Sequence, residues 1–166
     1  RPGDPVMNEA HARPVIGVVV AMPSELRHVL EPANLVHAET VGPWRDLHLD
    51  YQGRRLVAVC SGIGMVNAAA ATAHLLEAHS PGWVLNSGCA GAHRRDILPG
   101  DVVIGSGTVA HGAVHILPDG NDYFPQPEQP DPSDVMREIT LDATLVALAR
   151  EAATGWTPDP WPYPVS

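Results

Sequence analysis

Three short stretches of this chain carry polar groups directly after apolar runs, in a pattern suited to ligand binding, and two of the three contain glycine. The central stretch, residues 84–92, runs from an apolar segment into a turn that contains Gly88 and Gly91. Glycine lets the backbone turn tightly or approach a ligand closely. Similar junctions precede it at residues 21–25 and 61–64. Because the carboxyl ends of parallel strands meet at one edge of a sheet, the sequence predicts a ligand site there.

Glu25 is the residue in these junctions best suited to acid–base chemistry. It follows the apolar run 15–21 and falls in the first turn of a helix predicted to begin at Pro23. It could be a general base held at the sheet edge. Alternatively, it could be a carboxylate near the positive end of the helix dipole, where it contributes less than about 1 kcal/mol. Its position alone leaves both interpretations open.

The elements that must position these residues follow from hydrophobic periodicity. The β-branched run 15–21 predicts a central strand buried on both faces, as in a parallel sheet. The helix that follows should end at Pro32, and the alternating segment 47–51 should form a hairpin with 56–60. The remaining predicted elements are an apolar helix packed deeply against the sheet (66–79), two strands (83–86 and 102–104) and an amphipathic helix from Leu141 to near Gly155.

Composition limits the class of protein. The 166 residues suit one domain, and a net charge of -9 disfavours binding to nucleic acid. No run is long and apolar enough to span a membrane, and no signal peptide is evident. The two cysteines lie in no metal-binding spacing, which fits a reducing compartment. We therefore expect a cytoplasmic protein.

Neither a cofactor nor a metal ion is expected. The Gly62-x-Gly64 pair is not a dinucleotide fingerprint, because Asn67 stands where the third glycine should fall. His111 and His115 are four residues apart, but Gly112 lies between them and no third ligand is evident.

Four motifs in register carry a family resemblance. Residues 16–25, 61–69, 86–91 and 99–103 resemble, in order and spacing, the nucleoside phosphorylase superfamily, and in particular its 5′-methylthioadenosine/S-adenosylhomocysteine nucleosidase branch. The resemblance covers roughly residues 15–109. It implies an α/β fold of three layers, in which helices flank a twisted, mixed and largely parallel sheet, and a homodimer.

The resemblance also assigns site residues. Glu25 matches the carboxylate that activates the attacking water in this family. The matching substrate-binding positions are two apolar contacts to the 5′-alkylthio group and ribose, Met22 and Ile63, and a turn beside ribose and base, Cys89, Ala90 and Gly91. Cys89 departs from the family's serine, and a thiol is the weaker hydrogen-bond donor.

The implied reaction is hydrolysis of the N-glycosidic bond of a purine nucleoside, with release of adenine. A carboxylate in an apolar pocket would have its basicity raised by desolvation, which suits a base near neutral pH. One alternative is a phosphorylase, although residues 22–25 stand where an anion-binding loop would be expected. Another is an inactive remnant that binds nucleoside or serves as a dimerisation module, with Tyr123 and Phe124 as the contact.

The resemblance further implies a purine-binding aspartate and a Met-Glu pair in a C-terminal portion. No such motif follows Glu151, so the expectation is a fragment or a shortened family member that holds half a site. The expected organisation is a flexible leader (1–14), one α/β domain (15–155) and a Pro/Trp-rich tail (156–166).

Overall fold

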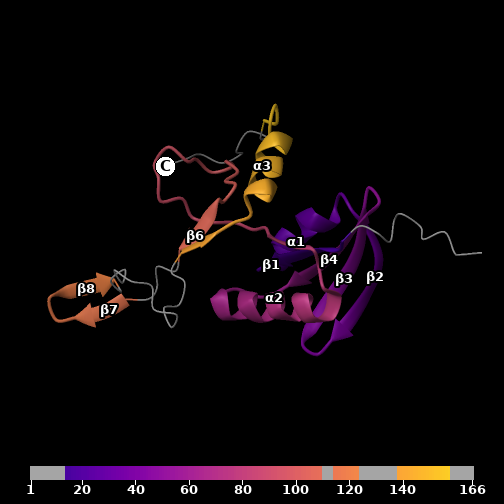
Figure 1. Cartoon of the computed structure of the whole chain (residues 1–166), viewed down its shortest axis with the longest axis horizontal. Helices are drawn as coiled ribbons and strands as arrows, with labels where there is room; N and C mark the ends of the chain where they lie inside the picture. Colours follow the sequence, from indigo (N-terminus) through magenta and orange to yellow (C-terminus); the bar gives the residue numbers. More distant parts are fainter. Residues whose placement is uncertain (1–13, 110–113, 124–137, 158–166) are drawn as a thin grey trace, which may run out of the picture. The chain divides into compact units, whose positions relative to one another are not determined.

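A computed structural model describes residues 14–109, 114–123 and 138–157. The chain divides after Gly91 into two units. The first unit holds five strands and two helices (Figure 1). Their bounds are β1 (Ile16–Val20), α1 (Pro23–Leu30), β2 (Asn34–Val41), β3 (Trp44–Tyr51), β4 (Arg54–Cys60), α2 (Met65–His79) and β5 (Trp83–Asn86).

The five strands form one mixed sheet in the order β2-β3-β4-β1-β5. Strand β1 pairs in parallel with both β4 and β5. The β2–β3 and β3–β4 pairs are antiparallel, which confirms the predicted hairpin. Since β1, β4 and β5 are neighbours and run in the same direction, their carboxyl ends lie side by side at one edge.

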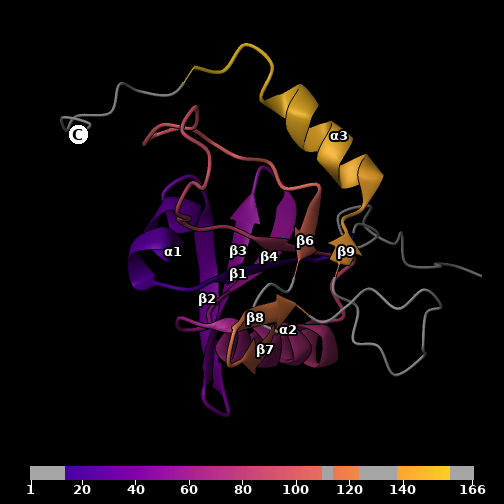
Figure 2. The same cartoon turned by 90° about the vertical axis from the view of Figure 1, so that its left-hand side faces the viewer.

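The two helices cover opposite faces of this sheet, which gives three layers (Figure 2). On one face, Val18 and Val20 of β1 lie in a core against which α1 packs. On the other face, Val19 of β1 is buried with Ala71 and Leu75 of α2. The continuous β-branched run therefore fills both cores, as a central strand should.

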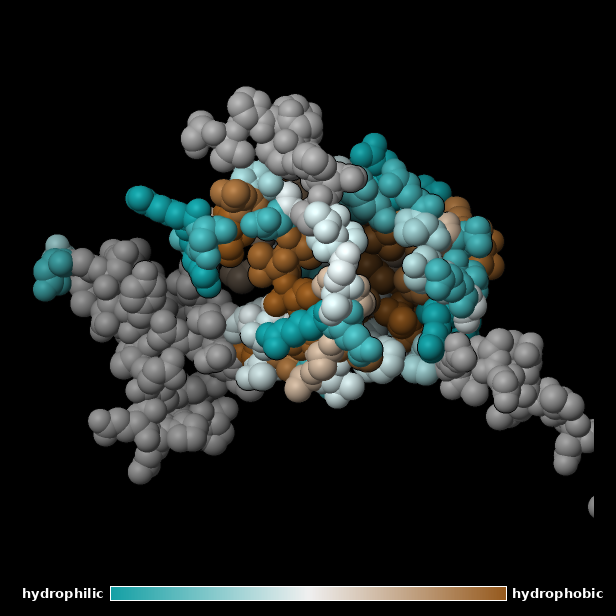
Figure 3. All heavy atoms as spheres, turned by 90° about the horizontal axis from the view of Figure 1, so that it is seen from above, coloured by the Kyte–Doolittle hydropathy of each residue, from teal (hydrophilic) through white to brown (hydrophobic). Residues whose placement is uncertain are grey.

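Helix α2 is less buried than its composition predicted. Of its residues only Ala71 and Leu75 are buried, while Met65, Val66 and Leu76 are exposed. The helix packs against the sheet as expected, but through one narrow face, so the expected depth of packing was overestimated. Figure 3 shows the molecule from above, and brown spheres on that face mark further hydrophobic residues that are visible from outside.

The described residues of the second unit form two short strand pairs and one helix. Strand β6 (Gly107–Val109) pairs with β9 (Glu138–Thr140), and β7 (Val114–Leu117) pairs with β8 (Gly120–Tyr123), both antiparallel. Helix α3 (Ala143–Ala152) confirms the predicted amphipathic helix, and the Asp142 side chain caps it by accepting from the Leu145 amide at 2.9 Å.

The strand predicted at residues 102–104 was wrong. These residues form no strand, and the side chains of Val102 and Val103 are exposed. Among the described residues no strand pairs with this segment, and β6 begins only at Gly107.

Several expectations fall on residues outside those described. They concern the leader, Phe124 of the proposed contact arm, His111 and most of the tail. Within the described ranges, no helix has both the length and the apolar character needed to cross a membrane.

Candidate active site

Main-chain hydrogen bonds hold the three predicted junctions together at the sheet edge. The Ser61 amide, just after β4, donates to the Val20 carbonyl of β1 at 2.8 Å. The Ser87 amide, just after β5, donates to the Val19 carbonyl at 3.2 Å. The loops that follow β4 and β5 therefore leave the sheet on either side of the end of β1.

Glu25 links two of these junctions. Its Oε2 atom accepts from the amides of Ala21 and Met22, both at 2.9 Å. Its Oε1 atom accepts from the amide of Cys89, 64 residues further on, at 2.8 Å. As the third residue of α1, Glu25 reaches back to the N-cap Met22, in the manner of one half of a capping box. The same side chain thus caps α1 and fixes the glycine-rich turn after β5.

Gly88 makes this arrangement possible. A Cβ atom at position 88 would lie 2.6 Å from Oε1 and 3.0 Å from Cδ of Glu25. Carbon and oxygen atoms cannot approach so closely without displacement. By contrast, a Cβ atom at Gly91 would meet nothing within 4 Å. Glycine at 88 therefore lets the turn pass close over the carboxylate without displacing it.

The electrostatic environment of Glu25 differs from the prediction. The amide of Cys89 is the largest cause of a lowered pKa for Glu25, burial opposes it, and the amides of Met22 and Ala21 add to the lowering. The expectation that desolvation raises its basicity was wrong, because three N–H donors stabilise the anion more than burial destabilises it. Glu25 is therefore ionised throughout the neutral pH range.

The Glu25 carboxylate is held mainly by backbone amides. Three N–H groups occupy three of the about four acceptor positions that a carboxylate offers. The Cys89 thiol is a further and weaker donor to the same carboxylate. Glu25 is 8% exposed. An ionised carboxylate fixed in this way can act as a proton acceptor.

The other predicted site residues lie on the same edge but make different contacts. Met22 is half-buried at the start of α1, and its amide binds Glu25. Ile63 is 74% exposed in the turn after β4. Ala90 and Gly91 are exposed just after Cys89. Among the described residues, the structure thus ties Met22 and Cys89 to Glu25 by hydrogen bonds and leaves Ile63, Ala90 and Gly91 without a bond to the carboxylate.

Two supporting residues of this edge were named in the sequence motifs without a role. The buried Ser61 hydroxyl donates to the carbonyl of Val20 at 3.2 Å or to that of Gly62 at 2.8 Å. The Asn86 amide group donates to the Val19 carbonyl at 3.2 Å. A small polar residue directly at a strand end was the available signal, since it can satisfy backbone carbonyls where the ladder stops.

Fold and site together agree with one known class of protein. The family model described as the Phosphorylase superfamily matches residues 15–159. The chain therefore belongs to the phosphorylase superfamily.

Individual relatives narrow the comparison. A 5′-methylthioadenosine/S-adenosylhomocysteine nucleosidase of Bacillus thuringiensis is 34% identical over 136 residues, which cover 82% of this chain and 56% of the relative. The nucleosidase of that name from Neisseria meningitidis, solved with methylthio-immucillin-A, has a TM-score of 0.69 and 31% identity, over 84% of this chain and 58% of that one.

A futalosine hydrolase of Helicobacter pylori is similar as well, with a TM-score of 0.69 and 25% identity over 87% of this chain and 59% of the hydrolase. The chain spans 56% of the length of the curated relatives that it matches. The phosphorylase/nucleosidase fold of the five-stranded unit is thereby confirmed.

Proposed function

We propose that the protein hydrolyses the N-glycosidic bond of a purine nucleoside of the 5′-methylthioadenosine/S-adenosylhomocysteine type and releases adenine. The observation that carries this proposal is the Glu25 carboxylate, held ionised by three amides at the edge where three parallel strands end. The names of the relatives supply the class of substrate.

In the proposed reaction, Glu25 accepts a proton from water as the water oxygen bonds to the anomeric carbon of the ribose. The bond from that carbon to the purine nitrogen breaks through an oxocarbenium-like transition state, and the electron pair leaves with the purine. The purine takes up a proton from solvent and departs as adenine, and Glu25 returns its proton to solvent. Since Glu25 is ionised at neutral pH, it can accept the proton without first losing one.

We assign the surrounding residues by their place on this edge. Met22 and Ile63 would contact the 5′-alkylthio group and ribose. The turn of Cys89, Ala90 and Gly91 would lie beside ribose and base. The Cys89 amide is already bound to Glu25. One hydrogen bond would therefore position both the turn beside the purine and the carboxylate that accepts the proton.

The test is adenine release from methylthioadenosine by the purified chain, followed by chromatography in phosphate-free buffer and again with phosphate. Release without phosphate supports hydrolysis, and Glu25→Gln should then lower the rate by roughly 10²–10⁴-fold, the usual contribution of a general base. The matched control is Glu31→Gln, which alters an exposed carboxylate after the same helix.

Three outcomes would contradict the proposal. A requirement for phosphate would indicate a phosphorylase instead. Nucleoside binding without turnover in either buffer would indicate a nucleoside-binding protein. An active Glu25→Gln variant would leave Glu25 as a helix cap only.

A further inference from the structure

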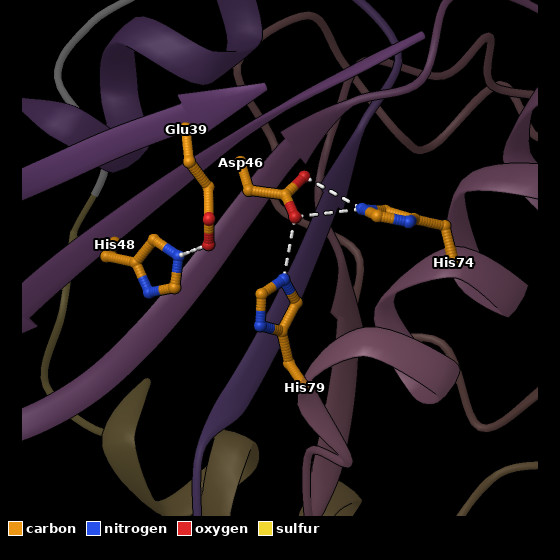
Figure 4. Close-up of polar contacts among 5 residues, drawn as sticks. All are labelled: Glu39, Asp46, His48, His74 and His79. Carbon is orange, nitrogen blue, oxygen red and sulfur yellow. Dashed lines mark hydrogen bonds and ion pairs between the residues drawn. The ribbon is translucent and has the colours of Figure 1, made fainter. Parts of the chain in front are cut away.

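A second group of polar side chains lies on the sheet face that α2 covers. Asp46 of β3 is fully buried, at 0% exposure. The Nε2 atom of His74 lies 2.9 Å from Oδ1 and 2.8 Å from Oδ2 of Asp46, and Nε2 of His79 lies 2.7 Å from Oδ2. Both imidazoles point at this one carboxylate (Figure 4).

Strand and helix periodicity bring the three residues together. Side chains alternate along β3, so Leu47 and Leu49 enter the α1 core while Asp46 lies on the α2 face. His74 and His79 belong to the second half of α2, and each side chain is 12% exposed. One ligand atom from each residue lies within 4.8 Å of the other two.

We propose that Asp46, His74 and His79 bind a divalent transition-metal ion of the zinc type. Two imidazole nitrogens and a carboxylate oxygen form a donor set that Zn²⁺ accepts, with water as a fourth ligand. Zinc–ligand bonds of about 2.0–2.2 Å in a tetrahedral site place neighbouring donor atoms roughly 3.3 Å apart. The observed separations of 2.7–2.9 Å need to widen by only about half an ångström.

The surroundings favour a cation over a simple hydrogen-bonded carboxylate. Glu39 of β2 is paired directly with Asp46 in the strand ladder, so two carboxylates are neighbours. Glu39 in turn contacts His48 Nε2 at 2.8 Å, and the His48 ring lies edge-on to His79 at 5.2 Å. A metal ion at Asp46 would offset the repulsion between the carboxylates. Imidazole donors favour zinc, nickel or copper over Ca²⁺ and Mg²⁺, which prefer oxygen ligands.

The site would be structural. It lies on the α2 face, whereas Glu25 belongs to α1 on the opposite face. A bound ion would fasten the second half of α2 to β3, and binding to the folded state alone would stabilise it in proportion to metal concentration. This inference is independent of the proposed nucleosidase activity.

The experiment uses the 166-residue chain without a histidine tag, stripped of metal with chelator and titrated with Zn²⁺. We expect one ion per chain by native mass spectrometry and calorimetry, a higher unfolding temperature with Zn²⁺ but not with Mg²⁺, and a tetrahedral absorption spectrum with Co²⁺. His74→Asn and His79→Asn should each weaken binding by at least about 100-fold, since even outer-shell changes cost 10–100-fold.

Two matched variants locate the ion. His28→Asn removes an exposed histidine of α1 and should change nothing. His48→Asn tests the neighbouring group of His37, Glu39 and His48, whose ligand atoms also lie within 4.8 Å of one another. It should leave one ion bound.

The proposal is overturned if the wild-type chain binds no Zn²⁺ saturably. It is also overturned if His48→Asn weakens binding as much as His74→Asn does, because the ion would then lie at the neighbouring group. If the His74 and His79 variants do not fold, NMR of the Co²⁺-loaded wild-type chain decides. Paramagnetically shifted imidazole signals from two histidines that persist in Co²⁺-loaded His48→Asn support the site, and their absence from that variant overturns it.

Discussion

The carboxylate of Glu25 performs two tasks with the same oxygen atoms. It caps the start of α1 through Ala21 and Met22, and it anchors the turn after β5 through Cys89. A carboxylate fixed from two sides loses little conformational entropy when a ligand binds, which would suit the proposed transfer of a proton to Glu25. The same donors lower its pKa, so position is gained at the expense of basicity.

The variant Gly88→Ala should show how far the reaction rate depends on the position of the Glu25 carboxylate, because it moves the carboxylate but keeps its charge. The new methyl group would displace Oε1 from the Cys89 amide without removing the carboxylate. A misplacement of about 1 Å can cost roughly 100-fold in rate, and we expect a loss of adenine release of that order. Equal rates for Gly88→Ala and the wild-type chain would show that the position of Glu25 does not limit the reaction.

The same variant should change how stability depends on pH. The pKa of Glu25 is lowered in the folded state, chiefly by the Cys89 amide. Its contribution to stability is therefore present above the unfolded value near 4.5 and is lost as the pH falls through the folded value. Urea-unfolding midpoints at pH 7 and pH 3 should differ less for Gly88→Ala than for the wild-type chain. Gly91→Ala, whose methyl group meets nothing, should behave like the wild type.

For individual residues, the sequence predicted which side chains lie close together better than it predicted their pKa shifts. The neighbourhood of Glu25 and Cys89 followed from the order of the motifs, because parallel strand ends share an edge. The direction of the pKa shift did not follow, since it depends on amides that approach only in the folded chain. Asp46, His74 and His79 were missed because they come from a strand and a helix 28 residues or more apart. The available sequence signal for this group was Asp46, a charged residue in a strand position that faces α2.

Among the elements, α2 is held to the sheet by very few residues. Leu75 is fully buried in the core with Val19, and its Cδ1 atom lies against Gly17 of β1. The neighbouring Leu76 is 51% exposed. The attachment of this helix therefore depends on one narrow apolar face together with the contacts of Asp46.

Leu75→Ala should lower the free energy of unfolding by about 2–5 kcal/mol, the usual cost of emptying a buried leucine site. Leu76→Ala is the matched control and should change it by no more than about 0.5 kcal/mol, because that side chain already contacts solvent. Urea unfolding followed by circular dichroism measures both. Similar losses for the two variants would mean that Leu76 is covered in solution.

Helices and strands with a clear hydrophobic pattern were predicted well, and those with a weak hydrophobic pattern were not. The run that became β1 and the hairpin of β3 and β4 followed from apolar continuity and alternation. Strand β2 was missed because every one of its residues is exposed, so no buried face imposes a pattern. The segment 102–104 has the composition of a strand but no partner strand in the part of the chain that the structure describes, and pairing is decided by the tertiary structure.

For the molecule as a whole, the exposed apolar residues in and just before the first turn of α2 offer a contact surface for the predicted homodimer. Ile63, Met65 and Val66 are 74%, 79% and 83% exposed. Exposed apolar patches commonly mark protein–protein contacts. We expect the chain to form dimers in sedimentation experiments at micromolar concentration and Val66→Glu to shift it toward monomer.

The control for this prediction is Ala78→Glu, which adds the same charge at an exposed position near the other end of α2. It should leave the dimer intact. A wild-type chain that sediments as a monomer at every concentration would contradict the homodimer, and equal effects of both variants would indicate a general response to charge.

Because a main-chain amide holds Glu25, different side chains at position 89 are compatible with this site. The Cys89 amide is the largest cause of the lowered pKa of Glu25 and the Cys89 thiol the smallest, so the contact barely depends on which side chain stands at 89. Cysteine in place of the serine that the resemblance implies is then a nearly neutral exchange for the hold on Glu25, whereas a methyl group at position 88 would displace the carboxylate. Mutational drift can therefore alter the exposed side chain at position 89 while the carboxylate of Glu25 stays in place.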